Sequence, residues 1–350
     1  MNRTKRNMNW RRRVFSVLMV AVLCLSMGMS AFADDDTLEY VALGDSITAG
    51  YGLSDVDTEG LVALFAESIG ADFSINCGVS GLTADYLLSA LNGSIDSTSS
   101  AALLVASIQT ALATADVVTL TIGGNDLLAA FYTVLEEIVA ANGIDLGDSS
   151  VQAVLADPTT DTTTIATLFN LINSTDLSTY LLSSSTFTDA VSTCVNNINS
   201  ITAAIKAINP DAVILLANQY NPYQWLYGAE GISALFEAGV TYFNTALAAG
   251  KTDDYTVVDV CSSFAASTDT LTNAYLSLDS TTGLPTDYSF DFHPNADGHS
   301  VIADTLATSY TALTGNEATE TGNSNSMVLW ISLMMIGTLG VAISKKETFF

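Results

Sequence analysis

The sequence predicts an α/β fold in which five short strands form a parallel sheet with helices on both faces. Five short apolar runs alternate with longer segments whose apolar residues recur at helical spacing. The runs are apolar almost throughout, which is typical of strands buried on both faces of a parallel sheet. Ligand sites in such sheets lie beyond the carboxyl ends of the strands, so the residues that follow each run are candidates for function.

The predicted strands are rich in β-branched and aromatic residues, and several end at glycine. They cover residues 38–43, 72–76, 116–122, 212–217 and 255–259. Helices are predicted over residues 60–69, 83–91, 101–114, 190–208 and 231–249. A helical insert of about residues 127–200 is longer than one crossover helix requires. Its apolar stretches, 131–135 and 165–172, form either a cap that shapes an acyl pocket or additional surface helices.

Residues 1–33 have the pattern of a secretory signal peptide. A basic segment with six Lys and Arg residues is followed by an apolar run that ends in Ala31-Phe32-Ala33, and acidic residues begin at position 34. This order predicts cleavage after Ala33. A retained membrane anchor is the alternative, and Arg12-Arg13 leaves export by the twin-arginine route open.

The other end of the sequence has the pattern of a tether to the cell surface. A polar linker covers residues 315–326, and an apolar run at 327–343 is followed by Lys345-Lys346. This tail resembles the cell-wall sorting signal of Gram-positive surface proteins, although Ala318 to Gly322 (ATETG) lacks the Leu and Pro of the usual LPxTG. We therefore expect residues 34–314 to be an exported domain on the surface of a Gram-positive bacterium. Sortase cleavage and a plain membrane anchor in residues 327–350 both remain open.

The charge balance excludes several classes of function. The chain carries 10 Lys+Arg against 37 Asp+Glu, with a formal net charge of −27, and its central part retains only Lys206 and Lys251 as basic residues. A nucleic-acid-binding protein needs basic residues to displace counterions from phosphates, so we expect no nucleic-acid partner. The spacings of Cys77, Cys194 and Cys261 match no zinc pattern, and no metal or cofactor is expected. The pairing of these cysteines and the oligomeric state are left open.

Polar motifs follow the first three predicted strands. Gly44-Asp45-Ser46 comes after the first strand, where Ser46 is either an exposed nucleophile or the N-cap of a short helix. Gly81 lies in the turn after the second strand, where glycine lets the backbone approach a ligand or makes a tight turn. Asn125 follows the third strand, and its side-chain amide can donate to an oxyanion.

Both histidines of the chain lie near the end of the central domain. His299 opens an apolar helical stretch, so it is expected in the first turn of a helix. His293 precedes this stretch on a loop and is free to face a site at the strand ends. A histidine base, if the protein uses one, is therefore expected to be His293.

Taken together, these motifs closely resemble the SGNH (GDSL) hydrolase family, in its lysophospholipase-like branch of lipases and esterases. The resemblance runs from about residue 40 to about residue 306, and it includes Ile122 to Asp126 (IGGND) and Tyr220 to Tyr223 (YNPY). It implies a flavodoxin-like three-layer α/β/α sandwich. It also implies that Ser46 is the nucleophile and His293 the base. The oxyanion hole would comprise the N–H groups of Ser46 and Gly81 and the amide of Asn125.

The acid that orients His293 departs from the pattern of the family. The family usually has Asp three residues before the histidine, where this chain has Phe290. Asp291 is the first candidate, the backbone carbonyl of Phe290 the second and Asp287 the third. Asp45, Tyr220 and Asn221 are the candidates for substrate binding. A cluster of mostly aromatic residues follows the fourth strand (Tyr220, Gln224, Trp225 and Tyr227). Three interpretations of this cluster are open: it lines an acyl pocket, it stacks on sugar rings, or it packs in the core.

We expect an exported serine ester hydrolase of lipase or lysophospholipase type that acts through an acyl-enzyme on Ser46. Its substrate would be an ester, and the acidic shell favours neutral or zwitterionic esters over polyanions. The family also hosts carbohydrate esterases, so deacetylation of a polysaccharide is the first alternative. A non-catalytic surface binding module is the second.

Overall fold

A computed structural model of the chain describes residues 37–94, 107–173, 177–315 and 327–329. The chain divides into a unit Met1–Thr37, of which Thr37 alone is described, and a unit Leu38–Phe350, which contains every element discussed below. The predicted signal peptide (1–33) therefore lies outside the described residues. So do positions 316–326 of the predicted linker and positions 330–350 of the predicted tail.

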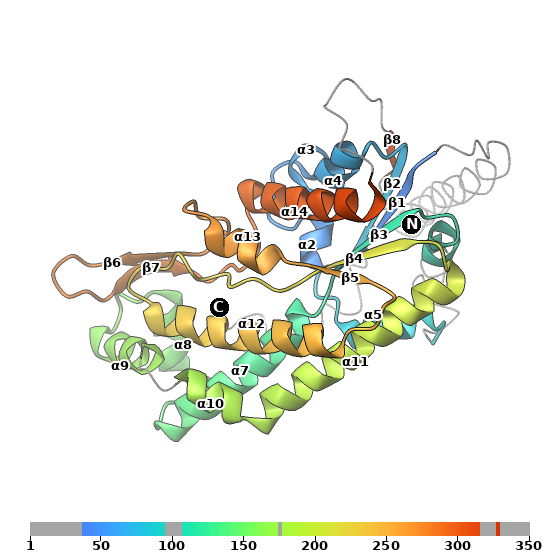
Figure 1. The fold of residues 1–350 in the computed structure, drawn as a ribbon. Helices are drawn as coiled ribbons and strands as arrows, with labels where there is room; N and C mark the ends of the chain where they lie inside the picture. The colour runs from blue at the N-terminus through green and yellow to red at the C-terminus, as the bar shows by residue number, and fades with distance from the viewer. Residues whose placement is uncertain (1–36, 95–106, 174–176, 316–326, 330–350) are drawn as a thin grey trace, which may run out of the picture. The chain divides into compact units, whose positions relative to one another are not determined.

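A parallel sheet forms the centre of the second unit (Figure 1). Its order is β5-β4-β3-β1-β2-β8. The five predicted strands are all present and parallel to one another: β1 (Glu39–Gly44), β2 (Phe73–Gly78), β3 (Val117–Thr121), β4 (Val213–Ala217) and β5 (Thr256–Val258). Because β1 lies between β2 and β3, the carboxyl ends of the first three predicted strands meet at one edge of the sheet. The α/β class with a five-stranded parallel sheet is confirmed.

A sixth, three-residue strand, β8 (Met327–Leu329), extends the sheet beside β2. These residues begin the apolar run that the sequence analysis assigned to an anchor, and they are extended here rather than helical. Within the part of the chain that the structure describes, no helix combines the length and the apolar character needed to cross a bilayer.

Helices cover both faces of the sheet because side chains along each strand alternate between them. Val41 and Leu43 join a cluster with α5 (Ala84–Leu91), α7 (Gly124–Ala141), α11 (Ser185–Ile208) and α12 (Glu230–Gly250). Tyr40 and Ala42 join a second cluster with α4 (Leu61–Ile69), α13 (Val260–Ala266) and α14 (Ala296–Thr314). Figure 1 shows the two helical layers on either side of the strands. The three-layer sandwich is therefore confirmed.

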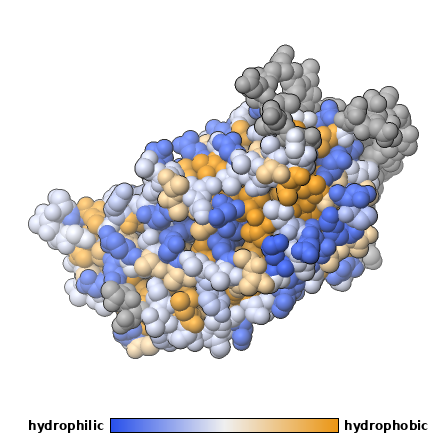
Figure 2. Space-filling view, viewed as in Figure 1, coloured by the Kyte–Doolittle hydropathy of each residue, from blue (hydrophilic) through white to orange (hydrophobic). Residues whose placement is uncertain are grey.

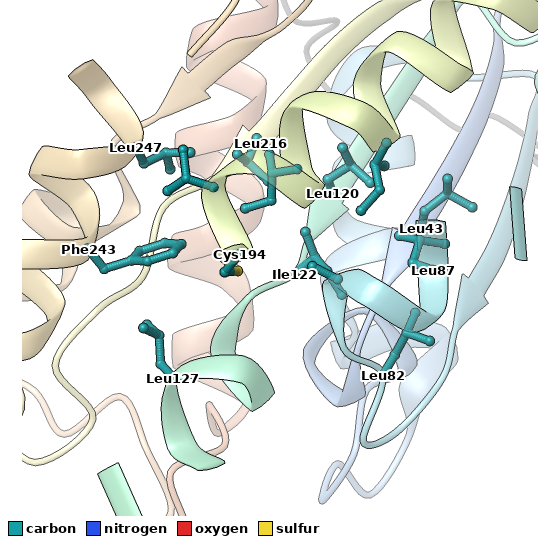
Figure 3. Close-up of a cluster of buried hydrophobic side chains, with 14 of the residues drawn as sticks. Leu43, Leu82, Leu87, Leu120, Ile122, Leu127, Cys194, Leu216, Phe243 and Leu247 are labelled. Atoms are coloured by element: carbon teal, nitrogen blue, oxygen red, sulfur yellow. The ribbon is translucent and has the colours of Figure 1, made fainter. Parts of the chain in front are cut away.

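Figure 3 shows part of the first cluster. Leu43, Leu120 and Leu216 come from three neighbouring strands, and Cys194, Phe243 and Leu247 come from the helices that cover them. All six side chains are buried. Such a core fixes the ends of the strands, where the candidate site residues lie.

The predicted helices are present within a few residues of their predicted ends, and for the prediction over 101–114 the structure describes a helix at 107–112. The remaining short helices are α2 (Ser46–Ala49), α3 (Val56–Glu59), α8 (Ser149–Ala156), α9 (Thr162–Ile172) and α10 (Leu177–Ser183). The insert is helical as predicted, and Val139, Val151 and Leu168 give part of it a small core of its own.

A hairpin of β6 (Tyr275–Leu278) and β7 (Pro285–Ser289) was not predicted. Its strands are short and largely exposed, so they lack the continuous apolar pattern of the central strands. The hairpin leads directly into the segment that carries Asp291 and His293. On the viewed surface, hydrophilic and apolar residues are intermixed, as on most soluble domains (Figure 2).

Candidate active site

Ser46 lies on the sharp turn between β1 and α2. The N-cap of α2 is Asp45, whose Oδ1 accepts hydrogen bonds from the Ile47 N–H at 3.0 Å and from Thr121 Oγ1 at 3.2 Å. The alternative interpretation of Ser46 as an N-cap is therefore wrong, because Asp45 fills that position and leaves the serine hydroxyl available. A side chain at Gly44 would collide with Thr121 and Thr48, so only glycine allows β3 to approach this turn.

His293 reaches Ser46 across the edge of the sheet. Its Nε2 lies 2.9 Å from Ser46 Oγ, and its Nδ1 lies 2.5 Å from Asp291 Oδ1. The Asp291 carboxylate also accepts from the His293 backbone N–H at 3.1 Å. The side chains of Ser46 and His293 are both buried. This chain of contacts has the order nucleophile, base and orienting acid that activated serines require.

The structure distinguishes the three candidates for the orienting group. Asp291 contacts the imidazole. The carbonyl oxygen of Phe290 instead accepts a hydrogen bond from Tyr223 Oη at 2.9 Å. Asp287 accepts one from Tyr275 Oη at 3.2 Å within the hairpin. Of these three groups, Asp291 is the one whose oxygen lies within hydrogen-bond distance of the His293 imidazole.

His299 is buried in the first turn of α14, as predicted. Its Nδ1 accepts from the Leu61 N–H at 3.2 Å, which ties α14 to α4. Burial lowers the pKa of His299 to about 4, so this imidazole is neutral near pH 7. It takes no part in the contacts of Ser46.

The expected oxyanion donors lie around the same strand ends. Gly81 adopts a left-handed conformation with φ of 79°. The Asn125 amide nitrogen donates to the carbonyl of Leu82 at 2.9 Å, which places this amide beside the Gly81 backbone. Asp126 accepts from the Ala84 N–H at 3.0 Å, which ties the first turn of α7 to the start of α5. Ser46 is the first residue of α2, so its N–H has no acceptor within that helix.

A pocket opens next to Ser46 and Asn125, and its walls are mainly apolar. They come from α7, α12, the loop after β4 and the loop before α14. The apolar lining side chains are those of Ile47, Leu127, Leu128, Phe131, Tyr220, Pro222, Phe236, Val240 and Phe292. Polar groups in the wall are few, and they include Asp45 and Gln219. Such a pocket is suited to a hydrocarbon chain attached to a polar reacting group.

The candidates for substrate binding have different surroundings. Asp45 and Tyr220 both line the pocket. The Tyr220 hydroxyl, however, donates to the carbonyl of Phe292 at 3.0 Å. The Asn221 amide nitrogen donates to the Ser233 carbonyl at 3.0 Å and to Glu237 at 3.2 Å, within its own part of the fold. The amide of Asn221 is thus engaged within the fold, which does not favour a contact with substrate. That contact stays a prediction.

The rest of the aromatic cluster after β4 lies away from the pocket lining. Trp225 packs against Phe264 with ring centroids 6.1 Å apart, and Gln224 donates to the Phe264 carbonyl at 2.7 Å. Tyr227 is 84% exposed. Of the three interpretations of this cluster, pocket lining applies to Tyr220 and packing applies to Trp225.

Electrostatics differ between the two carboxylates near His293. Burial raises the pKa of Asp45 to about 6. Hydrogen bonds from Ile47 and Thr121 lower this pKa, but the effect of burial is larger. Burial also raises the pKa of Asp291, but the hydrogen bonds from the side chain and backbone of His293 outweigh it, and the net shift is downward. Asp291 therefore remains ionised as a partner for an imidazolium.

Within the described ranges, no group of three or more His, Cys, Asp or Glu side chains is placed to hold a metal ion. Cys77, Cys194 and Cys261 are unpaired, and the first two are buried.

Sequence reasoning missed several residues around the site. Tyr51 contacts the ring of His293 with centroids 4.4 Å apart, and Phe292 does so at 4.3 Å. Leu128 and Gln219 line the pocket. Tyr51 and Phe292 are close in sequence to Ser46 and His293, which is the one signal that could have identified them.

Comparison with known proteins places the chain in a family. Residues 42–301 match the family described as GDSL-like Lipase/Acylhydrolase. Lipase 2 of Streptomyces coelicolor is 37% identical over a region that covers 33% of this chain and 41% of that protein. The chain thus matches less than half the length of this relative.

The similarity to solved structures is lower in sequence identity. The lipase Lip_vut3 from a goat rumen metagenome is 21% identical, with a TM-score of 0.48 over 78% of this chain and 97% of that chain. Phospholipase A1 from Streptomyces albidoflavus NA297 is 21% identical, with a TM-score of 0.42 over 78% of this chain and 99% of that chain. The family match takes in the greater part of the chain and all the residues gathered around Ser46, so the protein belongs to the GDSL-like lipase/acylhydrolase family.

Proposed function

We propose that the protein is a serine ester hydrolase that forms an acyl-enzyme on Ser46, with His293 as the general base and Asp291 as the orienting acid. The observation that carries the proposal is the continuous contact from Ser46 Oγ to His293 Nε2 at 2.9 Å and from His293 Nδ1 to Asp291 Oδ1 at 2.5 Å. A serine hydroxyl is a weak nucleophile near neutral pH and needs such a base beside it.

The proposed reaction uses these groups in two steps, formation of the acyl-enzyme and its hydrolysis. Ser46 Oγ attacks the ester carbonyl carbon while His293 Nε2 takes the hydroxyl proton. The carbonyl oxygen becomes negative and is stabilised by the N–H groups of Ser46 and Gly81 and the amide of Asn125. When the intermediate collapses, the alcohol leaves with the proton from His293 and the acyl group stays on Ser46. A water molecule then attacks the acyl carbon while His293 takes its proton. The bond from this carbon to Ser46 Oγ breaks, His293 returns the proton to Ser46 Oγ, and the carboxylic acid is released.

The pocket supports an acyl ester as the substrate. An acetyl group would leave most of the apolar wall formed by Leu127, Leu128, Phe131 and Phe236 unfilled, whereas a longer acyl chain would bury it. This favours lipase or lysophospholipase activity over deacetylation of a polysaccharide. The net charge of −27 disfavours polyanionic substrates.

The test is hydrolysis of p-nitrophenyl acetate, octanoate and palmitate by the full chain, with Ser46→Ala alongside. Ser74→Ala is the matched control, because Ser74 is also buried and its hydroxyl has no hydrogen-bond partner among the described residues. We expect activity in the wild type and in Ser74→Ala, its loss in Ser46→Ala, and faster turnover of octanoate than of acetate. Preference for acetate would favour the carbohydrate esterase. A folded protein without activity on any ester would favour the binding module.

The proposal includes export and attachment at the cell surface. Its support is the pattern of residues 1–33 and of the apolar, basic tail from 327 to 350. In a Gram-positive host, the full chain should remain with the cell envelope, and a variant that lacks residues 330–350 should enter the medium. Recovery of the full chain in the medium would contradict the tether. Sortase attachment would be seen as resistance of the envelope-bound protein to detergent extraction.

A further inference from the structure

We infer that Tyr220 and Tyr223 are positioning residues that hold the segment carrying Asp291 and His293 in its reactive place. The inference rests on the proposed function, because it gives His293 the role of the base. It assigns the hydroxyl group of Tyr220 a role different from the substrate contact that the sequence suggested.

The two hydroxyl groups bind the backbone on both sides of Asp291. Tyr223 Oη donates to the carbonyl of Phe290 at 2.9 Å, and Tyr220 Oη donates to the carbonyl of Phe292 at 3.0 Å. Both tyrosine side chains are buried. They belong to the loop after β4, so they connect the segment to a strand of the parallel sheet.

The held segment has other supports as well: the Asn295 N–H donates to the Leu271 carbonyl at 3.0 Å, and the Asn295 side-chain amide donates to the Thr270 carbonyl at 2.7 Å. The segment joins the end of β7 at Ser289 to the start of α14 at Ala296, and it lies outside the two sheets. The carbonyl of His293 accepts from the Asn273 N–H at 3.0 Å. Thr272, next to Asn273, donates its hydroxyl to the Pro222 carbonyl at 2.8 Å. The loop after β4 thus reaches the segment directly through two tyrosines and indirectly through Thr272.

Donation by these phenols does not depend on pH in the working range. Burial raises the pKa of Tyr220 and Tyr223 well above the ordinary value of 10, so both stay protonated. Without one of these donors, a partly buried carbonyl next to Asp291 loses that hydrogen bond, and its peptide is held less firmly. Because the reactive contact between His293 and Ser46 is 2.9 Å long, a small rotation weakens it.

The test compares Tyr220→Phe and Tyr223→Phe with Tyr255→Phe. Tyr255 is a matched control because it is also buried and its hydroxyl donates to Asn199 Oδ1 at 2.9 Å, outside the contacts of the site. With p-nitrophenyl octanoate and the full chain, we expect kcat to fall roughly fivefold or more in the first two variants, with KM within about twofold. All three variants should lose similar thermal stability, and only Tyr255→Phe should keep its kcat.

A second measurement needs no substrate. The short hydrogen bond between His293 Nδ1 and Asp291 should give a low-field proton resonance in the NMR spectrum, identified by its absence in His293→Gln. We expect this resonance to shift or broaden in Tyr220→Phe and Tyr223→Phe and to stay unchanged in Tyr255→Phe.

The outcomes separate the two proposals. If the wild type shows no hydrolysis that depends on Ser46, the proposed function fails. If the wild type is active but the two variants keep the kcat of Tyr255→Phe and an unchanged resonance, positioning is refuted. A rise in KM of Tyr220→Phe without loss of kcat would instead assign its hydroxyl to the substrate. Should one variant fail to fold, the other decides the result alone.

Discussion

Two buried titratable groups should act on the stability of this protein in opposite directions between pH 4 and pH 6.5. His299 is fully buried in α14, and its pKa falls from 6.5 to about 4 because burial disfavours the imidazolium. Asp45 is buried beneath Ser46, and its pKa rises from 3.8 to about 6 because burial disfavours the carboxylate. Each shift is a difference in proton binding between folded and unfolded chains, and therefore a change in stability with pH.

The sign differs for the two groups. The folded-state pKa of His299 is depressed, so its contribution to stability is present above pH 6.5 and is lost as the pH falls toward about 4. The folded-state pKa of Asp45 is raised, so its contribution is present below pH 3.8 and is lost as the pH rises through about 6. At about 1.4 kcal/mol per pH unit, each shift is worth about 3 kcal/mol. In the wild type the two contributions largely cancel.

The assay is urea unfolding at pH 7.5 and pH 5, which stays above the pI of about 4.1. Relative to the wild type, His299→Gln should gain about 2 kcal/mol in the free energy of unfolding when the pH is lowered from 7.5 to 5. Glutamine can still accept from the Leu61 N–H. Asp45→Asn should lose roughly 1–2 kcal/mol relative to the wild type over the same interval, because it lacks the stability that the wild type gains when Asp45 is protonated.

Comparison with the wild type removes the contributions of the other carboxylates, which all three proteins share. The reasoning fails if the difference between His299→Gln and the wild type is the same at both pH values. That result would mean that His299 is protonated in the folded chain with a partner the structure does not place beside it.

Three further predictions concern catalysis. Asp291→Asn should lower kcat at least tenfold in steady-state assays with little change in KM, because the amide cannot stabilise an imidazolium; an unchanged rate would remove Asp291 from the mechanism. Asn125→Ala should lower kcat by a factor of about 10² to 10³, or about 2.7–4 kcal/mol, if its amide stabilises the oxyanion, and a smaller loss in the same assay would assign it to loop packing. Leu128→Trp should lower kcat/KM for p-nitrophenyl octanoate at least tenfold and leave acetate within about twofold, because the larger side chain fills the apolar pocket; equal losses on both esters would contradict an acyl pocket there.

Local patterns in the sequence predicted the core of the fold. The strand at 116–122 is an unbroken β-rich run, and the structure has β3 at Val117–Thr121. The helix at 190–208 repeats its apolar residues at helical spacing, and the structure has α11 at Ser185–Ile208. These elements were predictable because the spacing of apolar residues along each element indicates which of its faces is buried.

The hairpin and the surroundings of the site were not predictable in this way. The hairpin strands are exposed and carry little apolar pattern. The pocket wall combines Leu128 of α7 with Phe236 of α12 and Phe292 of a loop, and their meeting depends on how the helices pack. The spacing of residues within one element does not indicate which side chains of other elements it will meet.

The sequence by itself determined the α/β class, the order of the strands and helices, the place of Ser46 directly after the first strand, and the place of His293 on a loop before the last helix. Only the tertiary structure decided that His293 lies 2.9 Å from a serine 247 positions away and that Asp291, rather than Asp287 or the Phe290 carbonyl, contacts its ring. It also decided that Asp45 caps α2 and that Asn221 binds within its own loop and helix. The physical reason is that periodicity and turn chemistry act over a few residues, whereas contacts between distant loops are fixed by the packing of the elements that carry them.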